Sequence, residues 1–122
     1  MAVSVLVVDD SAVSRSMVIR SLPTNWDVAI TEASNGSEAL AALDAKPHEV
    51  IILDLNMPVM DGYAFLEAMQ SSCSGAPIVI VLSGDVQPLA QARARMLGAT
   101  AFVRKPVRAQ SVLDALKESG VL

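Results

Sequence analysis

Four apolar segments of the sequence end in side chains that could carry phosphate or metal chemistry. Asp9 and Asp10 follow "SVLVV", Asp54 follows "EVIIL", Ser83 follows "IVIVL" and Lys105 follows "TAFVR". Adjacent carboxylates repel each other most strongly beside an apolar core, so a cation is expected to neutralise them. A lone Asp at a strand end is more often a helix cap or a turn residue. Acids, a hydroxyl and an ammonium at equivalent positions of several segments predict a shared site instead.

The residue types of this set indicate Mg²⁺ and phosphoryl chemistry. Mg²⁺ binds one or two carboxylates, keeps several waters and coordinates phosphate, whereas no His/Cys cluster suggests zinc. A metal ion beside Asp54 would neutralise a phosphoryl group during transfer to that carboxylate. Lys105 would add a second positive charge and Ser83 a hydroxyl for a phosphoryl oxygen. The sequence lacks the G-x-x-x-x-G-K-[ST], G-x-G-x-x-G and G-x-S-x-G motifs of nucleotide-binding proteins and serine hydrolases.

Strand-like and helix-like patterns alternate along the chain and would position these residues. The expected strands are 3–8, 27–33, 49–55, 77–83 and 100–105, and the first, third and fourth are the most apolar and β-branched. Helical periodicity lies between them: residues 11–22, the segments after Asn35-Gly36 and Asp61-Gly62, residues 86–97 and residues 109–116. This alternation predicts an α/β fold with a parallel sheet, covered by helices on both faces. Ligands of such sheets bind at the carboxyl ends of the strands.

Length and composition predict one domain over residues 1–122. Cys73 is the only cysteine, which fits a reducing compartment, and no signal peptide or transmembrane segment is evident, so a cytoplasmic, soluble protein is expected. The net charge of −4 argues against direct nucleic-acid binding. The stretch from Arg93 to Arg108 nevertheless carries five cations and no acid. It is either a solvated face or a docking face for an acidic partner. His48 is interpreted as a loop residue before a strand.

The chain resembles the receiver domain of response regulators in two-component signalling along nearly its whole length. The motifs are "VLVVDDS", "IILDLNMPVMDG", "VLSGD" and "GATAFVRKP", of which the run from Asp54 is the most specific. The first of them, with the helix that follows, looks most like single-domain chemotaxis-type receivers. The resemblance implies a doubly wound, flavodoxin-like fold with five parallel strands in the order 2-1-3-4-5 and five helices.

The resemblance also implies roles for individual residues. Asp54 would be the phosphoacceptor, phosphorylated by a histidine kinase or a phosphotransfer protein. Asp9, Asp10 and Asp54, with the backbone carbonyl of Asn56, would hold Mg²⁺. Which of the first two acids ligates directly stays open.

Further roles concern the response to phosphorylation. Ser83 would be the switch hydroxyl, Lys105 would pair with the phosphorylated acid, and Phe102 would be the aromatic that rotates inward. The Lys105–Pro106 bond is expected to be cis. The side chains of Asn56 and Asp85 would tune dephosphorylation. Asp61 and Gly62 would cap and turn the third helix.

Three function classes remain open at this point. The favoured one is a phosphorylatable switch that remodels the face of the fourth helix, fifth strand and fifth helix to bind an acidic protein target. The alternative is a pseudo-receiver, a docking module independent of phosphorylation. An enzyme working through an aspartyl phosphate is disfavoured because Asn56 interrupts the D-x-D signature of that chemistry. The chain is therefore expected to be a regulator with at most slow self-dephosphorylation.

Overall fold

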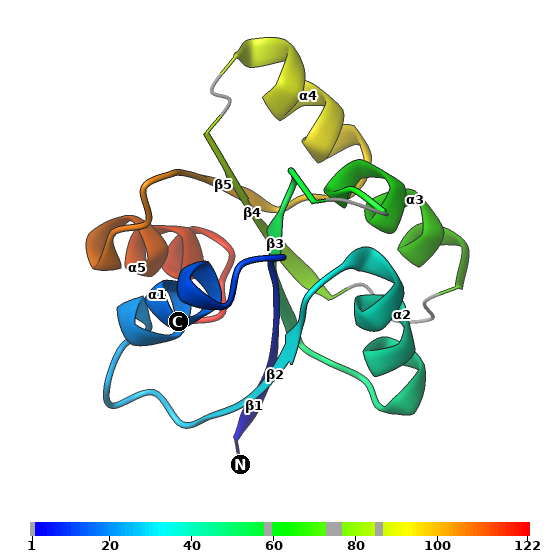
Figure 1. Cartoon of the computed structure of the whole chain (residues 1–122). Helices are drawn as coiled ribbons and strands as arrows, with labels where there is room; N and C mark the ends of the chain where they lie inside the picture. Colours follow the sequence, from blue (N-terminus) through cyan, green and yellow to red (C-terminus); the bar gives the residue numbers. More distant parts are fainter. Residues whose placement is uncertain (1, 58–59, 73–76, 85–86) are drawn as a thin grey trace.

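The computed structural model describes residues 2–57, 60–72, 77–84 and 87–122. Five strands and five helices alternate along these residues (Figure 1). The strands are β1 (Val3–Val8), β2 (Val28–Ala33), β3 (Val50–Asp54), β4 (Ile78–Ser83) and β5 (Ala101–Arg104). The helices are α1 (Ala12–Ser21), α2 (Gly36–Ala45), α3 (Gly62–Ser72), α4 (Pro88–Met96) and α5 (Ala109–Glu118). The predicted segments are thus confirmed, with ends shifted by a few residues.

All pairs of neighbouring strands in the sheet are parallel, in the order β2-β1-β3-β4-β5. This order confirms the doubly wound topology, and it places the three most apolar strands at the centre. Each of these three is uniformly buried along most of its length, which a sheet covered on both faces requires. β2, more polar in sequence, forms one edge and β5 the other.

Helices α1 and α5 lie on one side of the sheet and α2, α3 and α4 on the other (Figure 1), and an apolar cluster lies on each face. On one face, Leu6, Ile51 and Val79 pack against buried residues of α2, α3 and α4. On the other, alternate residues such as Val7 and Ile52 pack against α1 and α5. This alternation follows from the period of two along a strand.

α1 and α3 begin at residues whose side chains or backbones satisfy the free N–H groups of the first turn. The hydroxyl of Ser11 accepts from the N–H of Ser14 at 3.2 Å, and Asp61 Oδ1 accepts from the N–H of Ala64 at 2.9 Å. Asp61 therefore caps α3 as predicted. A Cβ on Gly62 would lie 2.7 Å from the Cα of Leu55, so only glycine lets α3 start this close to the end of β3.

α4 differs from its expected packing. Leu89 belongs to the apolar period that predicted this helix, yet it is 82% exposed, and Met96 is 83% exposed. Ala94 is the buried residue of the helix. Apolar periodicity identified the helix correctly, but it did not distinguish a buried face from an apolar face open to solvent. Val86, also part of the predicted period, lies outside the described residues. None of the helices in the described part of the chain has the length and apolar character that a transmembrane segment needs.

Candidate functional site

The parallel sheet brings the predicted residues to one edge because its strands all end there. Asp9 follows β1 directly, Asp54 and Ser83 are the last residues of β3 and β4, and Lys105 follows β5 directly. The strand register keeps these ends level: Asp54 pairs with Leu82, one residue before Ser83. The N–H of Lys105 donates to the carbonyl of Ser83 at 2.9 Å, which joins the ends of β4 and β5.

The carboxylates of Asp9, Asp10 and Asp54 form the acidic centre of this edge. One oxygen from each lies within 4.8 Å of the other two. Asp9 and Asp54 are 1% and 2% exposed, whereas Asp10 faces solvent. Three hard oxygen ligands with one side open to water suit a divalent cation that retains waters. The donor set therefore fits the predicted metal site, and these three residues could hold the ion.

Lys105 neutralises part of the negative charge of this centre. Its Nζ lies 3.3 Å from Asp54 Oδ1 and 3.4 Å from Asp9 Oδ2. The ammonium of Lys105, just past the end of β5, contacts both buried acids, while Asp10 lies on the solvent side. One positive charge against three carboxylates leaves the site electronegative, and this excess favours binding of a further cation.

Burial dominates the protonation of Asp54. Loss of solvent and the neighbouring charge of Asp9 raise the pKa of this carboxyl above its usual range. The ammonium of Lys105 and the N–H of Asn56, which donates to Asp54 Oδ1 at 3.2 Å, act in the opposite direction and lower that pKa. The net rise means that the folded protein without metal holds this carboxylate at a cost in free energy.

Side chains at the edge divide between the two faces of the sheet. Along each strand the alternation assigns Asp9, Asp54 and Lys105 to the face covered by α1 and α5. The same alternation assigns Ser83 and Phe102 to the face covered by α2, α3 and α4, where Phe102 is half-buried against the apolar cluster. The predicted switch pair therefore lies on the α4 side, and Asp9 and Asp54 lie on the other side.

The remaining sequence predictions have mixed outcomes. The Lys105–Pro106 peptide bond is cis, as expected. Asn56 is exposed beside the site, whereas Asp85 and Cys73 lie outside the described residues. His48 is a loop residue, as interpreted, but it is only 7% exposed.

The basic residues of the stretch from Arg93 to Arg108 do not all lie together. The guanidinium carbon of Arg93 stands 4.0 Å from the ring centroid of Tyr63, so this arginine is stacked against α3. Arg104 and Arg108 make no ion pair with any described acid, and with Lys105, Pro106 and Ser111 they line an open pocket of about 480 Å³.

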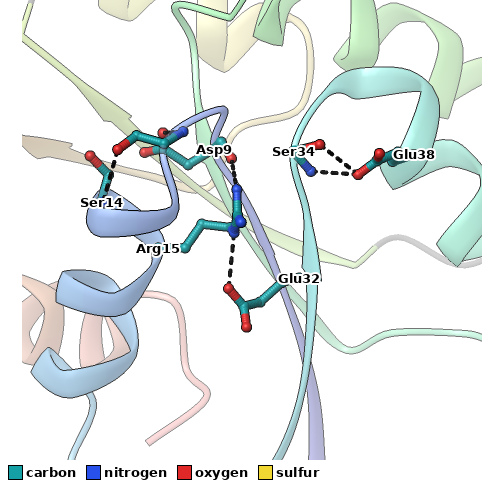
Figure 2. A network of polar contacts seen from close by, with 7 residues as sticks. Asp9, Ser14, Arg15, Glu32, Ser34 and Glu38 are labelled. Carbon is teal, nitrogen blue, oxygen red and sulfur yellow. Dashed lines mark hydrogen bonds and ion pairs between the residues drawn. The ribbon is translucent and has the colours of Figure 1, made fainter.

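Sequence reasoning missed Arg15, which adjoins the acidic centre. Its Nη1 donates to the backbone carbonyl of Asp9 at 2.7 Å, and its Nε contacts Glu32 at 2.9 Å (Figure 2). A signal was present in the sequence. A cation in the first turns of a helix opposes the helix dipole, so an arginine four residues after the cap of α1 calls for a specific partner.

Known proteins share this architecture and sequence pattern. A family model described as "Response regulator receiver domain" matches residues 5–117. The chain is 33% identical over 118 residues to the probable chemotaxis protein CheY of Rhizobium etli, covering 94% of this chain and 90% of that protein. It is 36% identical over 120 residues to a protein-glutamate methylesterase/protein-glutamine glutaminase of Moorella thermoacetica, of which it spans 28%. The structure of Vibrio cholerae chemotaxis protein CheY4 matches with a TM-score of 0.87 and 31% identity, over 98% of this chain and 99% of that one.

Proposed function

Because this chain belongs to the response regulator receiver family, we propose that it is a phosphorylatable switch whose Asp54 accepts a phosphoryl group from a histidine kinase or phosphotransfer protein. Residues 1–122 act as one receiver domain in this proposal. The observation that carries it is the contact of Lys105 with two buried acids, Asp9 and Asp54, beside an exposed third acid. A structural ion pair would need only one of those acids.

The proposed reaction uses Asp54 as an oxygen nucleophile. A carboxylate oxygen forms a bond to phosphorus while the phosphorus–nitrogen bond of a phosphohistidine breaks, and the electron pair leaves with the imidazole. Lys105 stands where its ammonium can neutralise the growing charge on the phosphoryl oxygens. Asp9, Asp10 and Asp54, with the backbone carbonyl of Asn56, would hold Mg²⁺, which supplies two further positive charges there.

In this proposal, the conformational change that follows phosphorylation of Asp54 extends from one face of the sheet to the other. Ser83, at the end of β4, would bond a phosphoryl oxygen, and Phe102 would move toward the space that this hydroxyl leaves. Both side chains belong to the face that α4 covers, so the change would reach α4 and β5. The side chains of Asn56 and Asp85 would tune hydrolysis of the phosphoaspartate. The chain acts in this scheme as a regulator and hydrolyses its own phosphoaspartate only slowly.

The α4-β5-α5 face supplies features suited to an acidic protein target. Leu89 and Met96 offer exposed apolar area, while Arg104 and Arg108 line the open pocket without an ion pair to a described acid. Binding of a target should weaken with salt and on Arg108→Glu. A target whose binding is unchanged by salt and by Arg108→Glu would contradict this part of the proposal.

Incubation with acetyl phosphate and Mg²⁺, followed by intact mass measurement, tests the phosphoacceptor role. We expect one phosphoryl adduct on the wild type, none when the metal is chelated, and none on Asp54→Asn. Asp27→Asn, which changes an exposed acid ahead of β2, is the matched control and should be phosphorylated like the wild type. Equal phosphorylation of Asp54→Asn and the control would overturn the proposal.

A further inference from the structure

The main chain of Asp9 is held at both of its polar groups. Its N–H donates to the carbonyl of Ala33 in β2 at 3.1 Å. Beyond the end of the β1 ladder, its carbonyl accepts from a side chain, Nη1 of Arg15, at 2.7 Å. Its carboxylate is also fixed, because Oδ1 accepts from the N–H of Ser11 at 2.9 Å and Oδ2 contacts Lys105. The buried acid of the site thus has little freedom while Arg15 is in place.

Arg15 is itself oriented by a second contact. Figure 2 shows its guanidinium between the carbonyl of Asp9 and the carboxylate of Glu32 on β2. The Nε to Oε1 distance is 2.9 Å, and the side chain of Arg15 is only 17% exposed, against 48% for that of Glu32. Glu32 also cancels the charge of Arg15. An uncompensated cation here would repel a metal ion bound to Asp9.

From these contacts we propose that Arg15 is a positioning residue for the metal site and that Glu32 acts through it. Arg15 fixes the turn between β1 and α1, and this turn carries both Asp9 and Asp10. The inference rests on the proposed Mg²⁺ site and deepens it. Neither residue touches the site's ligand atoms, because the bond runs to the backbone carbonyl.

The physical reason is the burial of the Asp9 carbonyl. Asp9 is 1% exposed, so without Arg15 this acceptor would lose its donor where water has little access. The turn would then relax to find another donor, and the carboxylates would leave the geometry that a small, hard cation requires. Loss of a partner behind the metal ligands typically weakens binding by about 10–100-fold. Ser11 still holds the carboxylate, so we expect the lower end of that range.

Calorimetric titration with Mg²⁺ alone tests the assignment. We expect Arg15→Ala to raise the dissociation constant about tenfold and Arg15→Lys, which keeps one donor, to raise it less. Arg20→Ala is the matched control, since this exposed arginine of the same helix bonds only the carbonyl of Ser16 in the described structure. It should bind Mg²⁺ like the wild type.

A double-mutant cycle isolates Glu32. Glu32→Gln should weaken Mg²⁺ binding about twofold in the wild type and have no effect in the Arg15→Ala background, because Glu32 acts through the arginine. Equal effects in both backgrounds would overturn the role given to Glu32.

Phosphorylation by acetyl phosphate separates positioning from a general loss of structure. In Arg15→Ala the Mg²⁺ concentration for half-maximal rate should rise about tenfold, while the rate at saturating Mg²⁺ stays within about twofold of the wild type. A variant that unfolds more easily but binds Mg²⁺ like Arg20→Ala would overturn the inference and leave the proposed function standing. Absence of Mg²⁺ binding in the wild type would overturn both.

Discussion

His48 and Asp54 lie at opposite ends of the same strand, and the contrast between them separates structural burial from functional burial. His48 is 7% exposed just before β3, and Asp54 is 2% exposed at its end. Nδ1 of His48 donates to the carbonyl of Lys46 at 3.1 Å, and Nε2 lies 3.2 Å from the hydroxyl of Thr31. The neutral ring satisfies both partners. Asp54 instead faces Asp9, a like charge, and has Lys105 as the shared counter-ion.

Burial moves both groups toward their neutral forms, with opposite consequences for stability. It raises the pKa of Asp54, while burial and the charge of Lys46 lower the pKa of His48. Acidification therefore stabilises the fold through Asp54 and destabilises it through His48. At the structural site, the partners of His48 hydrogen-bond its neutral ring, which is the form that burial favours. The acidic centre instead holds neighbouring carboxylates whose repulsion is relieved when a cation binds or when Asp54 takes up a proton.

The largest expected effect comes from removing the cation at the acidic end. Lys105→Ala should slow phosphorylation of Asp54 by acetyl phosphate about 100-fold, because one preorganised positive contact to the phosphoryl oxygens is lost. Lys117→Ala, an exposed lysine in the last turn of α5, is the control. Intact mass against time measures both rates, and equal rates would remove Lys105 from the mechanism.

A smaller effect concerns the stability of the metal-free protein. The raised pKa means that folded Asp54 holds a proton that the unfolded chain has already released, so stability falls as the pH rises from about 4 toward the raised value. Asp54→Asn should not show this fall and should be more stable than the wild type at neutral pH. Urea unfolding of both proteins measures the difference.

Mg²⁺ provides the check on that prediction. It should stabilise the wild type and leave the Asp54→Asn protein nearly unchanged at the same concentration, since a ligand stabilises only the state that binds it. A wild type that is more stable than Asp54→Asn without metal at neutral pH would contradict the account of the acidic edge.

The smallest effect belongs to His48. Because its pKa is lowered, the stability that the neutral ring contributes is present above about pH 6.5 and is lost as the pH falls through the folded value. His48→Asn, which retains a donor for the Lys46 carbonyl, should abolish this acid sensitivity and cost less than about 1 kcal/mol at neutral pH. Urea unfolding of the wild type and the variant, at neutral pH and at a pH below about 6.5, measures both effects. A changed rate of Asp54 phosphorylation in this variant would contradict the separate roles given to the two ends of β3.

The same contrast explains what the sequence could predict. Asp9, Asp54 and Lys105 were predicted together because parallel strands end at one edge and the register follows from the strands themselves. The position of Arg15 was not, since its bond to the Asp9 carbonyl depends on how a long side chain folds back along α1. The burial of His48 was missed because a partner on β2, Thr31, satisfies it from seventeen residues away. Leu89 followed helical periodicity, which does not report which apolar face is covered.

The central claim is that occupation of Asp54 on one face of the sheet controls Ser83 and Phe102 on the other. Beryllofluoride, a phosphoryl mimic, tests it directly when added with Mg²⁺ to isotope-labelled wild type and Asp54→Asn and followed by amide NMR. We predict shifts at Ser83, Phe102 and along α4 in the wild type, unchanged signals at His48 and Thr31, and no shifts in Asp54→Asn. Identical spectra of the wild type before and after addition, or equal shifts in both proteins, would contradict the account.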